Sequence, residues 1–258
     1  MPRYFLTLEY HGDHFCGWQR QENGLGVQQV VEAAVAALTG ACSRVHGAGR
    51  TDAGVHATGQ VAHVDLAKDY GAQTVVNALN AHLRPHAVAI LAARRVADEV
   101  HARFDATARA YRYRIRNRRA PLTLEAGLAW HVPAELDVAA MGEAAAILVG
   151  RHDFTSFRAA ECQAASAVKT LDRLDIRRTA DLVEIEAEAR SFLHHQVRNM
   201  VGTLVRVGKA RWSPARVAAA LDARDRAAAG PTAPACGLYL ERVDYADLNP
   251  PRDFEPAC

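Results

Sequence analysis

The chain has 258 residues, a length that suits one large globular unit or two smaller domains. Half of its residues are hydrophobic, although 52 of these are alanine, and 31 basic and 29 acidic side chains leave a formal net charge of only +2. Taken alone, that balance argues against a partner as anionic as nucleic acid.

Simple patterns exclude several classes of protein. No run approaches the roughly 18 consecutive apolar residues of a membrane span, and the start of the chain lacks the regions of a secretory signal. The five cysteines are scattered and form no C-x-x-C pair, so neither a disulfide framework nor a zinc knuckle is indicated. We therefore expect a reduced, soluble, cytoplasmic protein.

The first part of the chain shows the periods of strands and helices in turn. Strands are predicted at residues 4–10, 60–66, 88–96 and 109–116, and helices at residues 27–38 and 73–81. Gly40 is placed to end the first helix. In the strand at 109–116, Tyr111, Tyr113 and Ile115 share one predicted face, and three arginines share the other.

Residues 116–127 have the composition of a loop or domain connection, and similar elements follow it. Helices are predicted at residues 139–149, at 192–208 and from Pro214, and strands at 169–177, 182–189 and 238–243. Strands come in neighbouring pairs between helices, which favours an α+β fold with a largely antiparallel sheet. We divide the chain into an N-terminal subdomain, residues 1–117, and a C-terminal subdomain, residues 118–258.

The densest signal for chemistry is GAGRTDAGVH at residues 47–56. Its glycines let the backbone turn sharply and approach a ligand closely, and Asp52 lies at its centre, two residues after Arg50. An arginine near a carboxylate favours the ionised form, so Asp52 would be a nucleophile or base. The pattern also fits a plain tight turn in which the aspartate bonds its own backbone, and spacing alone does not decide between the two.

The basic residues are concentrated in two segments. Residues 103–119 hold seven arginines and one acid, and residues 190–211 hold five basic residues and no acid, so together they carry +11 and the rest carries −9. This distribution predicts a defined track for an anion, since arginine's planar fork suits phosphates. The alternative is a solvated face, with Arg112, Arg114 and Arg116 protecting a sheet edge.

Aromatic side chains interleave with that charge. Tyr111 and Tyr113 alternate with arginines, as in surfaces that stack unpaired bases, although core packing is expected for one of the two. In the predicted helix at 192–208, Arg198 lies away from the apolar stripe. Gly202, four residues on, weakens the helix and so indicates a close approach there.

No cofactor and no metal are predicted. Among the twelve histidines, His194 and His195 are adjacent and would point to different helix faces, and His63 with Asp65 has no third and fourth ligand at a recognisable spacing. Neither a phosphate-cradling G-x-x-x-x-G-K nor a G-x-S-x-G elbow is present.

With these motifs in place, the chain resembles the tRNA pseudouridine synthase A family. The motifs that carry the resemblance are, in chain order, YHG, GWQRQ, GRTDAGVH with GQV, HARF, ATAR, YRY, HDFTSFR, FLHH, VRN and GLYL. They cover nearly the whole chain. His11, Asp105 and Ala110 depart from the usual pattern at motif flanks, so they bear on RNA contacts and not on the chemistry.

The resemblance implies an enzyme that isomerises uridine to pseudouridine at nucleotides 38, 39 and 40, in the anticodon arm of tRNA. It implies no metal or organic cofactor, a homodimer, and two similar subdomains that share a bent antiparallel sheet with the active-site cleft between them. By motif, Asp52 is the catalytic aspartate and Tyr111 packs against the target uracil. Arg198 is expected to pair with the Asp52 carboxylate, and Arg50 to help displace the flipped base.

Several alternatives stay open at the level of sequence. Asp52 could attack the sugar carbon or remove a sugar proton. A non-catalytic RNA-binding module would show the same charge and aromatic pattern. A glycosidase-like hydrolase would need a second carboxylate, for which Asp13 is the only other acid in the nearby motifs.

Overall fold

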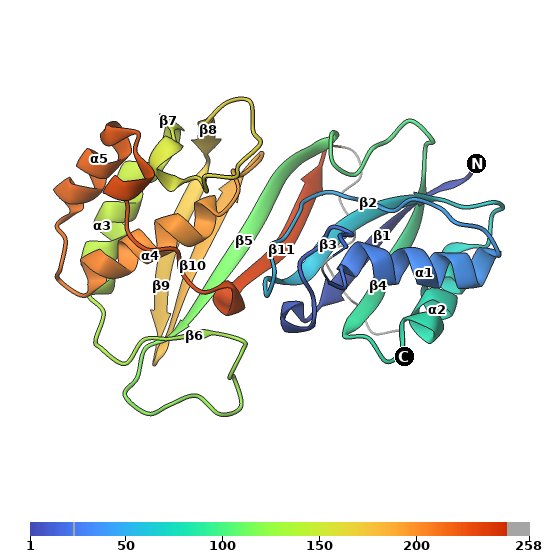
Figure 1. Ribbon diagram of the computed structural model, residues 1–258, viewed down its shortest axis with the longest axis horizontal. Coiled ribbons are helices and arrows are strands. Elements are labelled where there is room, and N and C mark those ends of the chain that lie inside the picture. Colours follow the sequence, from blue (N-terminus) through green and yellow to red (C-terminus); the bar gives the residue numbers. More distant parts are fainter. Residues whose placement is uncertain (23, 247–258) are drawn as a thin grey trace. The chain divides into compact units, whose positions relative to one another are not determined.

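The structure, a computed structural model, describes residues 1–22 and 24–246 of the chain. Within that part, nine strands belong to one sheet whose neighbours are mostly antiparallel. A separate two-stranded sheet joins β7 (Gly150–Asp153) to β8 (Val168–Leu171). The predicted α+β class with a mainly antiparallel sheet flanked by helices is confirmed (Figure 1).

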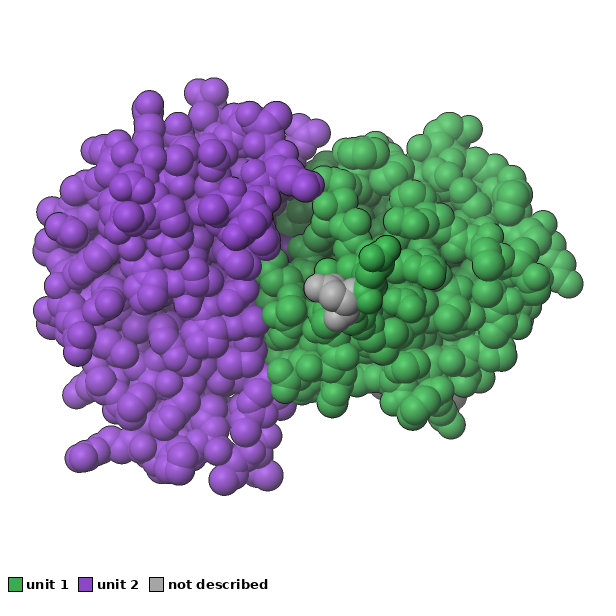
Figure 2. Space-filling view, viewed as in Figure 1, with its two compact units in different colours: residues 1–109, 240–258 green, residues 110–239 purple. Residues whose placement is uncertain are grey.

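The chain divides into two compact units, which Figure 2 colours separately. Unit 1 comprises Met1–Arg109 and the stretch that begins at Leu240, and unit 2 comprises Ala110–Tyr239. Two strands run from one unit into the other, β5 (Ala106–Arg116) and β11 (Leu238–Tyr245). The predicted subdomain boundary after residue 117 stays a prediction.

Unit 1 has a sheet covered by two helices. Its elements are β1 (Arg3–Tyr10), the 3-10 turn η1 (Gly12–His14), α1 (Val27–Thr39), β2 (His46–Gly47), β3 (His56–Asp65), α2 (Ala72–Leu83) and β4 (Val88–Val96). β1 pairs antiparallel with β3 on one side and β4 on the other, and β11 lies beyond β3. The predicted strands 4–10 and 88–96 and both predicted helices are confirmed within two residues, whereas β3 begins four residues before the predicted start.

The core of unit 1 follows from the apolar periods of its elements. Tyr4, Leu6 and Leu8 of β1 are fully buried, as alternation requires. The valine stripe of α1 and the apolar positions of α2 are buried too, and the two helices pack against each other, with α2 on β4. Gly40 ends α1 in the left-handed conformation with φ 73°, and its N–H donates to the Ala36 carbonyl at 2.8 Å.

Unit 2 has the same kinds of element in another order. After β5 come β6 (Trp130–His131), α3 (Val138–Leu148), β7, η2 (Thr155–Phe157), β8, β9 (Arg173–Thr179), β10 (Leu182–Ala189), α4 (Gln196–Gly208), α5 (Pro214–Ala223), η3 (Arg226–Ala228) and η4 (Ala235–Gly237). The strand order is β5-β10-β9, and α3 packs on β9 and against α4 and α5.

Two predicted elements of unit 2 need correction. The single strand predicted at 169–177 is two strands, because the backbone changes partner at Asp172: β8 pairs with β7, and β9 with β10. The helix predicted from residue 192 begins at Gln196, because His195 adopts the left-handed conformation with φ 61°. At the start of the helix, the side chain of Gln196 accepts a hydrogen bond from the N–H of Leu193 at 2.9 Å.

No helix in residues 1–22 and 24–246 is both long enough and apolar enough to cross a lipid bilayer.

Candidate functional site

Asp52 opens a tight turn in unit 1, directly before β3. Its carbonyl accepts the N–H of Val55 at 3.1 Å, and Gly54, the third residue of the turn, has φ 77°. A turn with a positive φ at its third residue favours glycine there. The predicted tight turn is therefore present, and the side chain of Asp52 is half-buried.

Two glycines from the loop after β1 hold this turn from outside. A Cβ on Gly12 would lie 2.1 Å from the Val55 carbonyl oxygen, and one on Gly17 would lie 2.6 Å from the Thr51 carbonyl oxygen. Gly17 also has φ 101°, which side chains rarely adopt. The backbone of the aspartate loop therefore packs directly on the backbone of residues 12–17, with no room for a methyl group between them.

A buried polar network fixes the residues ahead of Asp52. The amide of Gln60, fully buried on β3, donates to the Gly49 carbonyl at 2.8 Å and accepts the Gly49 N–H at 3.3 Å. The Tyr10 hydroxyl lies 2.8 Å from the Thr51 hydroxyl and 3.5 Å from the Gln60 amide nitrogen. Burial raises the pKa of Tyr10, so its hydroxyl stays protonated at neutral pH. Gly49 and Thr51, the residues on either side of Arg50, are thus anchored to strands.

Arg109 also binds the backbone of this loop, at Ala48. Its side chain is 7 % exposed, and a single nitrogen, Nη2, donates to the Ala48 carbonyl at 2.8 Å and to the Arg103 carbonyl at 2.7 Å. One of the seven arginines in the first basic segment therefore binds backbone inside the protein and adds nothing to a surface track for an anion.

The four predicted site residues fall in both units. Asp52 and exposed Arg50 share the loop of unit 1. In unit 2, Tyr111 of β5 is 9 % exposed, and its ring makes an edge contact with Phe192 at a centroid distance of 5.2 Å. Arg198 of α4 donates from Nε to the Ala233 carbonyl at 2.8 Å.

Core packing accounts for the second tyrosine of β5. Tyr113 is fully buried, and its hydroxyl donates to the Pro234 carbonyl at 2.7 Å. Its ring fills the space where a Cβ of Gly237 would lie, 2.6 Å from the nearest ring atom. The close approach predicted at Gly202 also comes from within the protein, because the Pro231 carbonyl packs against that turn of α4.

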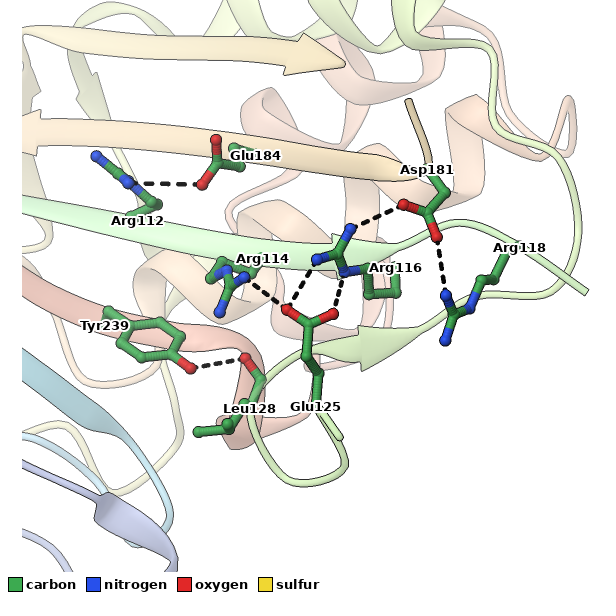
Figure 3. A network of polar contacts seen from close by, with 9 residues as sticks. All are labelled: Arg112, Arg114, Arg116, Arg118, Glu125, Leu128, Asp181, Glu184 and Tyr239. Atoms are coloured by element: carbon green, nitrogen blue, oxygen red, sulfur yellow. Dashed lines mark hydrogen bonds and ion pairs between the residues drawn. The ribbon is translucent and has the colours of Figure 1, made fainter. Parts of the chain in front are cut away.

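The arginines of β5 are not free to form the predicted track. Arg114 and Arg116 both bind Glu125, and Arg116 also binds Asp181 at 2.8 Å (Figure 3). Arg112 lies 3.5 Å from Glu184 on β10. The suggestion that these arginines protect a sheet edge is wrong too, because β5 is an internal strand between β11 and β10.

The histidines offer one cluster to test for a metal in unit 1. His46, His63 and His101 each place a ring nitrogen within 4.8 Å of the others. Burial lowers the pKa of all three, and the charge of Arg3 lowers it further, to about 4 for His63. The three rings are therefore neutral at pH 7, which is the form that binds metals.

Their hydrogen bonds, however, direct the lone pairs elsewhere. Nδ1 of His63 accepts the Ala102 N–H at 3.1 Å, and Nδ1 of His101 accepts the Arg103 N–H at 3.0 Å. A neutral imidazole whose Nδ1 accepts carries its proton on Nε2, so neither ring presents a lone pair to a metal in this arrangement. The His63 bond instead ties the turn at residues 101–105 to β3, and the His101 bond lies within that turn.

A different correction applies to His194 and His195. They precede α4 rather than lying on it, so they do not point to different helix faces as predicted, and their ring centroids are 4.0 Å apart.

Sequence reasoning predicted Asp52 as a site residue but missed the residues that hold its loop. Tyr10, Gly12, Gly17, Gln60 and Arg109 all lie within the motifs that carry the resemblance, yet no spacing rule relates them to the aspartate. The available signal was the pair of glycines in the loop after β1, since two glycines close together indicate a close backbone approach.

A half-buried carboxylate on such a fixed loop can act on an electrophilic carbon or a proton that is brought to it. Redox chemistry is not required for either step. The arrangement is consistent with nucleophilic or general-base catalysis by Asp52.

Comparisons with known proteins agree with the sequence motifs. The chain matches the family model described as tRNA pseudouridine synthase over residues 7–105 and 144–246. A tRNA pseudouridine synthase A from Rhodospirillum rubrum is 60 % identical over 245 residues, covering 95 % of this chain and 88 % of the relative. The proteins of the same name from Beijerinckia indica and Afipia carboxidovorans are 57 % and 61 % identical, covering 99 % and 95 % of this chain and 98 % and 100 % of the relatives.

Proposed function

Because the chain belongs to the tRNA pseudouridine synthase family, we propose that it isomerises uridine to pseudouridine at positions 38, 39 and 40 in the anticodon arm of tRNA, with Asp52 as the catalytic carboxylate. The observation that carries the proposal is the fixed loop of unit 1. Asp52 lies in the motif GRTDAGVH, between residues that Tyr10, Gln60 and two tightly packed glycines hold in place. Such preorganisation is what a catalytic carboxylate needs.

The proposed reaction has three parts, and Asp52 supplies the group that starts it. The C–N glycosidic bond breaks, the freed uracil rotates, and a C–C bond forms to the same sugar. Asp52 either attacks the sugar carbon, in a bond that breaks again when the C–C bond forms, or removes a sugar proton that is later returned. In both routes the uracil carbon that joins the sugar loses its proton while the freed nitrogen gains one, and both need the ionised carboxylate. No atom is gained or lost overall, so the reaction needs no oxidant, reductant or energy source.

Arg50, Tyr111 and Arg198 are the proposed substrate-binding residues. The target base must leave the helical stack, which costs a few kcal/mol. Arg50 is exposed beside Asp52 and is suited to occupy the space that the base vacates. Tyr111 would pack against the uracil, and Arg198 would pair with the Asp52 carboxylate. We further propose that the enzyme acts in the cytoplasm as a homodimer.

Asp52→Asn tests the central assignment. The substitution keeps the size of the side chain and removes its charge, so we expect pseudouridine formation in tRNA to fall by at least about a thousandfold while tRNA affinity changes less than about threefold. Site-resolved mapping of pseudouridine and filter binding give the two readouts. Asp13→Asn is the matched control, since Asp13 is an exposed acid in the neighbouring motif, and it should retain activity. Full activity in Asp52→Asn would overturn the assignment.

The same assay distinguishes a synthase from the two alternatives, a glycosidase-like hydrolase and a non-catalytic RNA-binding module. A hydrolase would release free uracil and leave an abasic site, and a binding module would leave every uridine unchanged at high enzyme concentration. Stoichiometric conversion of uridine without uracil release is the expected result for a synthase.

A further inference from the structure

Phe104 is the one phenylalanine, tyrosine or tryptophan that is exposed among residues 1–22 and 24–246. It lies in unit 1, on the turn between β4 and β5, and 67 % of it is exposed. Its ring lies 4.3 Å from the ring of His101 at an angle of 34°, and the guanidinium of Arg103 lies 5.8 Å from its centroid. About two thirds of this residue is therefore accessible to solvent, and a cation lies near its ring.

The turn that carries Phe104 is fixed by its own hydrogen bonds. The Asp105 N–H donates to the His101 carbonyl at 3.1 Å, and the Asp105 carboxylate accepts the His101 N–H at 2.7 Å. The Arg103 N–H donates to Nδ1 of His101 at 3.0 Å. Asp105, the acid nearest in sequence, is thus engaged in the turn, and the exposure of Phe104 belongs to an ordered backbone.

The same turn is bound to the loop of Asp52. Nη2 of Arg109 donates to the Arg103 carbonyl and to the Ala48 carbonyl, which lies four residues before Asp52. The aromatic ring and the carboxylate therefore sit on two backbone segments that one buried side chain holds together within unit 1.

We propose that Phe104, with Arg103 beside it, is a stacking site for an unpaired base of the RNA substrate, outside the pocket that takes the reacting uridine. The inference rests on the proposed function for the identity of the RNA. Bases stack on exposed aromatic rings, and a neighbouring arginine strengthens the contact through the phosphate or the π-face. Such a site would fix the position of the RNA relative to the Asp52 loop.

An RNA base fits this surface better than a second copy of the chain does. Stable protein interfaces bury about 800 Å² on each partner around an apolar centre. Among the described residues of unit 1, the other large apolar residues with marked exposure are Met1 and Leu25, and the amino group of Met1 lies 3.6 Å from Asp98 in the same β4–β5 connection. A single ring beside an arginine matches the size of one base.

Phe104→Ala and Phe104→Leu remove the ring, and Phe104→Trp keeps one. We expect the first two to weaken binding of transcribed tRNA about 5- to 100-fold, and Phe104→Trp to stay within about threefold of the wild type. Leu124→Ala is the matched control, because Leu124 is an apolar side chain that is 94 % exposed in unit 2, and it should bind normally. Unchanged affinity in Phe104→Ala, or an equal loss in Phe104→Trp, would overturn the proposal.

Sedimentation of each variant separates the two possible occupants. A change from dimer to monomer in Phe104→Ala, with tRNA affinity per subunit unchanged, would show that the ring contacts a second copy and would also overturn the stacking site. Pseudouridine formation by the wild type is measured in parallel, since its absence would refute the proposed function and leave the binding comparison readable.

Discussion

At the scale of single residues, the position of Asp52 depends on the absence of side chains at Gly12 and Gly17. Gly12 and Gly17 allow backbone to touch backbone around the loop, and any side chain there would have to displace Thr51, Asp52 or Val55. The polar contacts of Tyr10 and Gln60 then fix the loop laterally. A catalytic group held in this way loses rate when it moves by about 1 Å.

Gly17→Ala should therefore reduce both the stability of the protein and its activity. The methyl group would meet the Thr51 carbonyl at 2.6 Å and the residue has φ 101°, so we expect a loss of about 2–4 kcal/mol in unfolding free energy and at least about a tenfold loss in kcat. Urea denaturation and single-turnover assays measure these.

Gly40→Ala is the control for backbone strain alone. Gly40 lies at the end of α1 with φ 73°, and an added methyl group would have no atom within 4 Å. The substitution should cost about 1 kcal/mol of stability and leave kcat unchanged. An equal fall in kcat for both variants would contradict the positioning role of Gly17.

At the scale of elements, α4 is held by the loop that follows α5. The Gly230 N–H donates to the Thr203 hydroxyl at 2.9 Å, and the Ala233 N–H donates to the Arg198 carbonyl at 3.1 Å. The Pro231 carbonyl lies where a Cβ of Gly202 would be, 1.7 Å away. The low helix propensity of Gly202 is thus offset by packing, and the helix that carries Arg198 keeps its place through these contacts.

Glycine-to-alanine substitutions in α4 and α3 should change the stability of the protein in opposite directions. Gly202→Ala forces the 230–233 loop away, so we expect it to destabilise the protein by about 3 kcal/mol or more. Gly142 in α3 has no atom within 4 Å of an added methyl group, so Gly142→Ala should stabilise by about 0.5–1 kcal/mol. Thermal denaturation decides, and a stabilised Gly202→Ala would refute the packing argument.

The ion pairs of Glu125 predict a pH dependence. Arg116 holds the pKa of Glu125 below its ordinary 4.5, so the pairing stabilises the fold above that pH and the contribution is lost as the pH falls through the lower folded value. Glu125→Gln should therefore cost about 1 kcal/mol at pH 7, and the difference from the wild type should shrink below about pH 4.5. Glu143→Gln, an exposed glutamate of α3, should show no such trend in urea denaturation. A constant difference for Glu125→Gln would contradict the assignment.

The spacing of apolar residues predicted most helices and strands. It failed where the bounds of an element depend on the strand it pairs with or on the backbone conformation of one residue. The spacing of apolar residues located β1, α1 and β4, because each has one buried face. The break at Asp172 was invisible, since β8 and β9 have the same strand character and differ only in the strand they pair with. The late start of α4 depends on the φ of one residue, His195, which composition does not reveal.

At the scale of the whole molecule, the basic segments are less available than their charge suggests. Glu125, Asp181 and Glu184 lie outside those segments and bind the arginines of β5. A count along the sequence could not show this, because Asp181 and Arg116 are 65 residues apart. The proposed catalytic carboxylate, Asp52, stands out in a local motif, whereas charge available to a partner is a property of the folded surface.

Binding of tRNA should still weaken as salt rises, by a smaller slope than a track of eleven charges would give. Each phosphate contact contributes about −0.7 to −0.9 to the slope of log affinity against log salt. We expect Arg50→Gln, an exposed residue, to make the slope shallower by about one contact, and Arg114→Gln, paired with Glu125, to leave it unchanged. Filter binding across a salt series measures both, and a shallower slope in Arg114→Gln would restore β5 to the RNA-binding track.

The division of unit 1 along the chain has a consequence for its biosynthesis. The strand β11 lies beside β3 in the sheet, yet the ribosome makes it more than 170 residues later. At common elongation rates, β3 therefore waits on the order of ten seconds or more with one edge uncovered. The part of the protein that carries Asp52 is translated first and completed last, so a nascent chain that stops before β11 should be a substrate for chaperones rather than an enzyme.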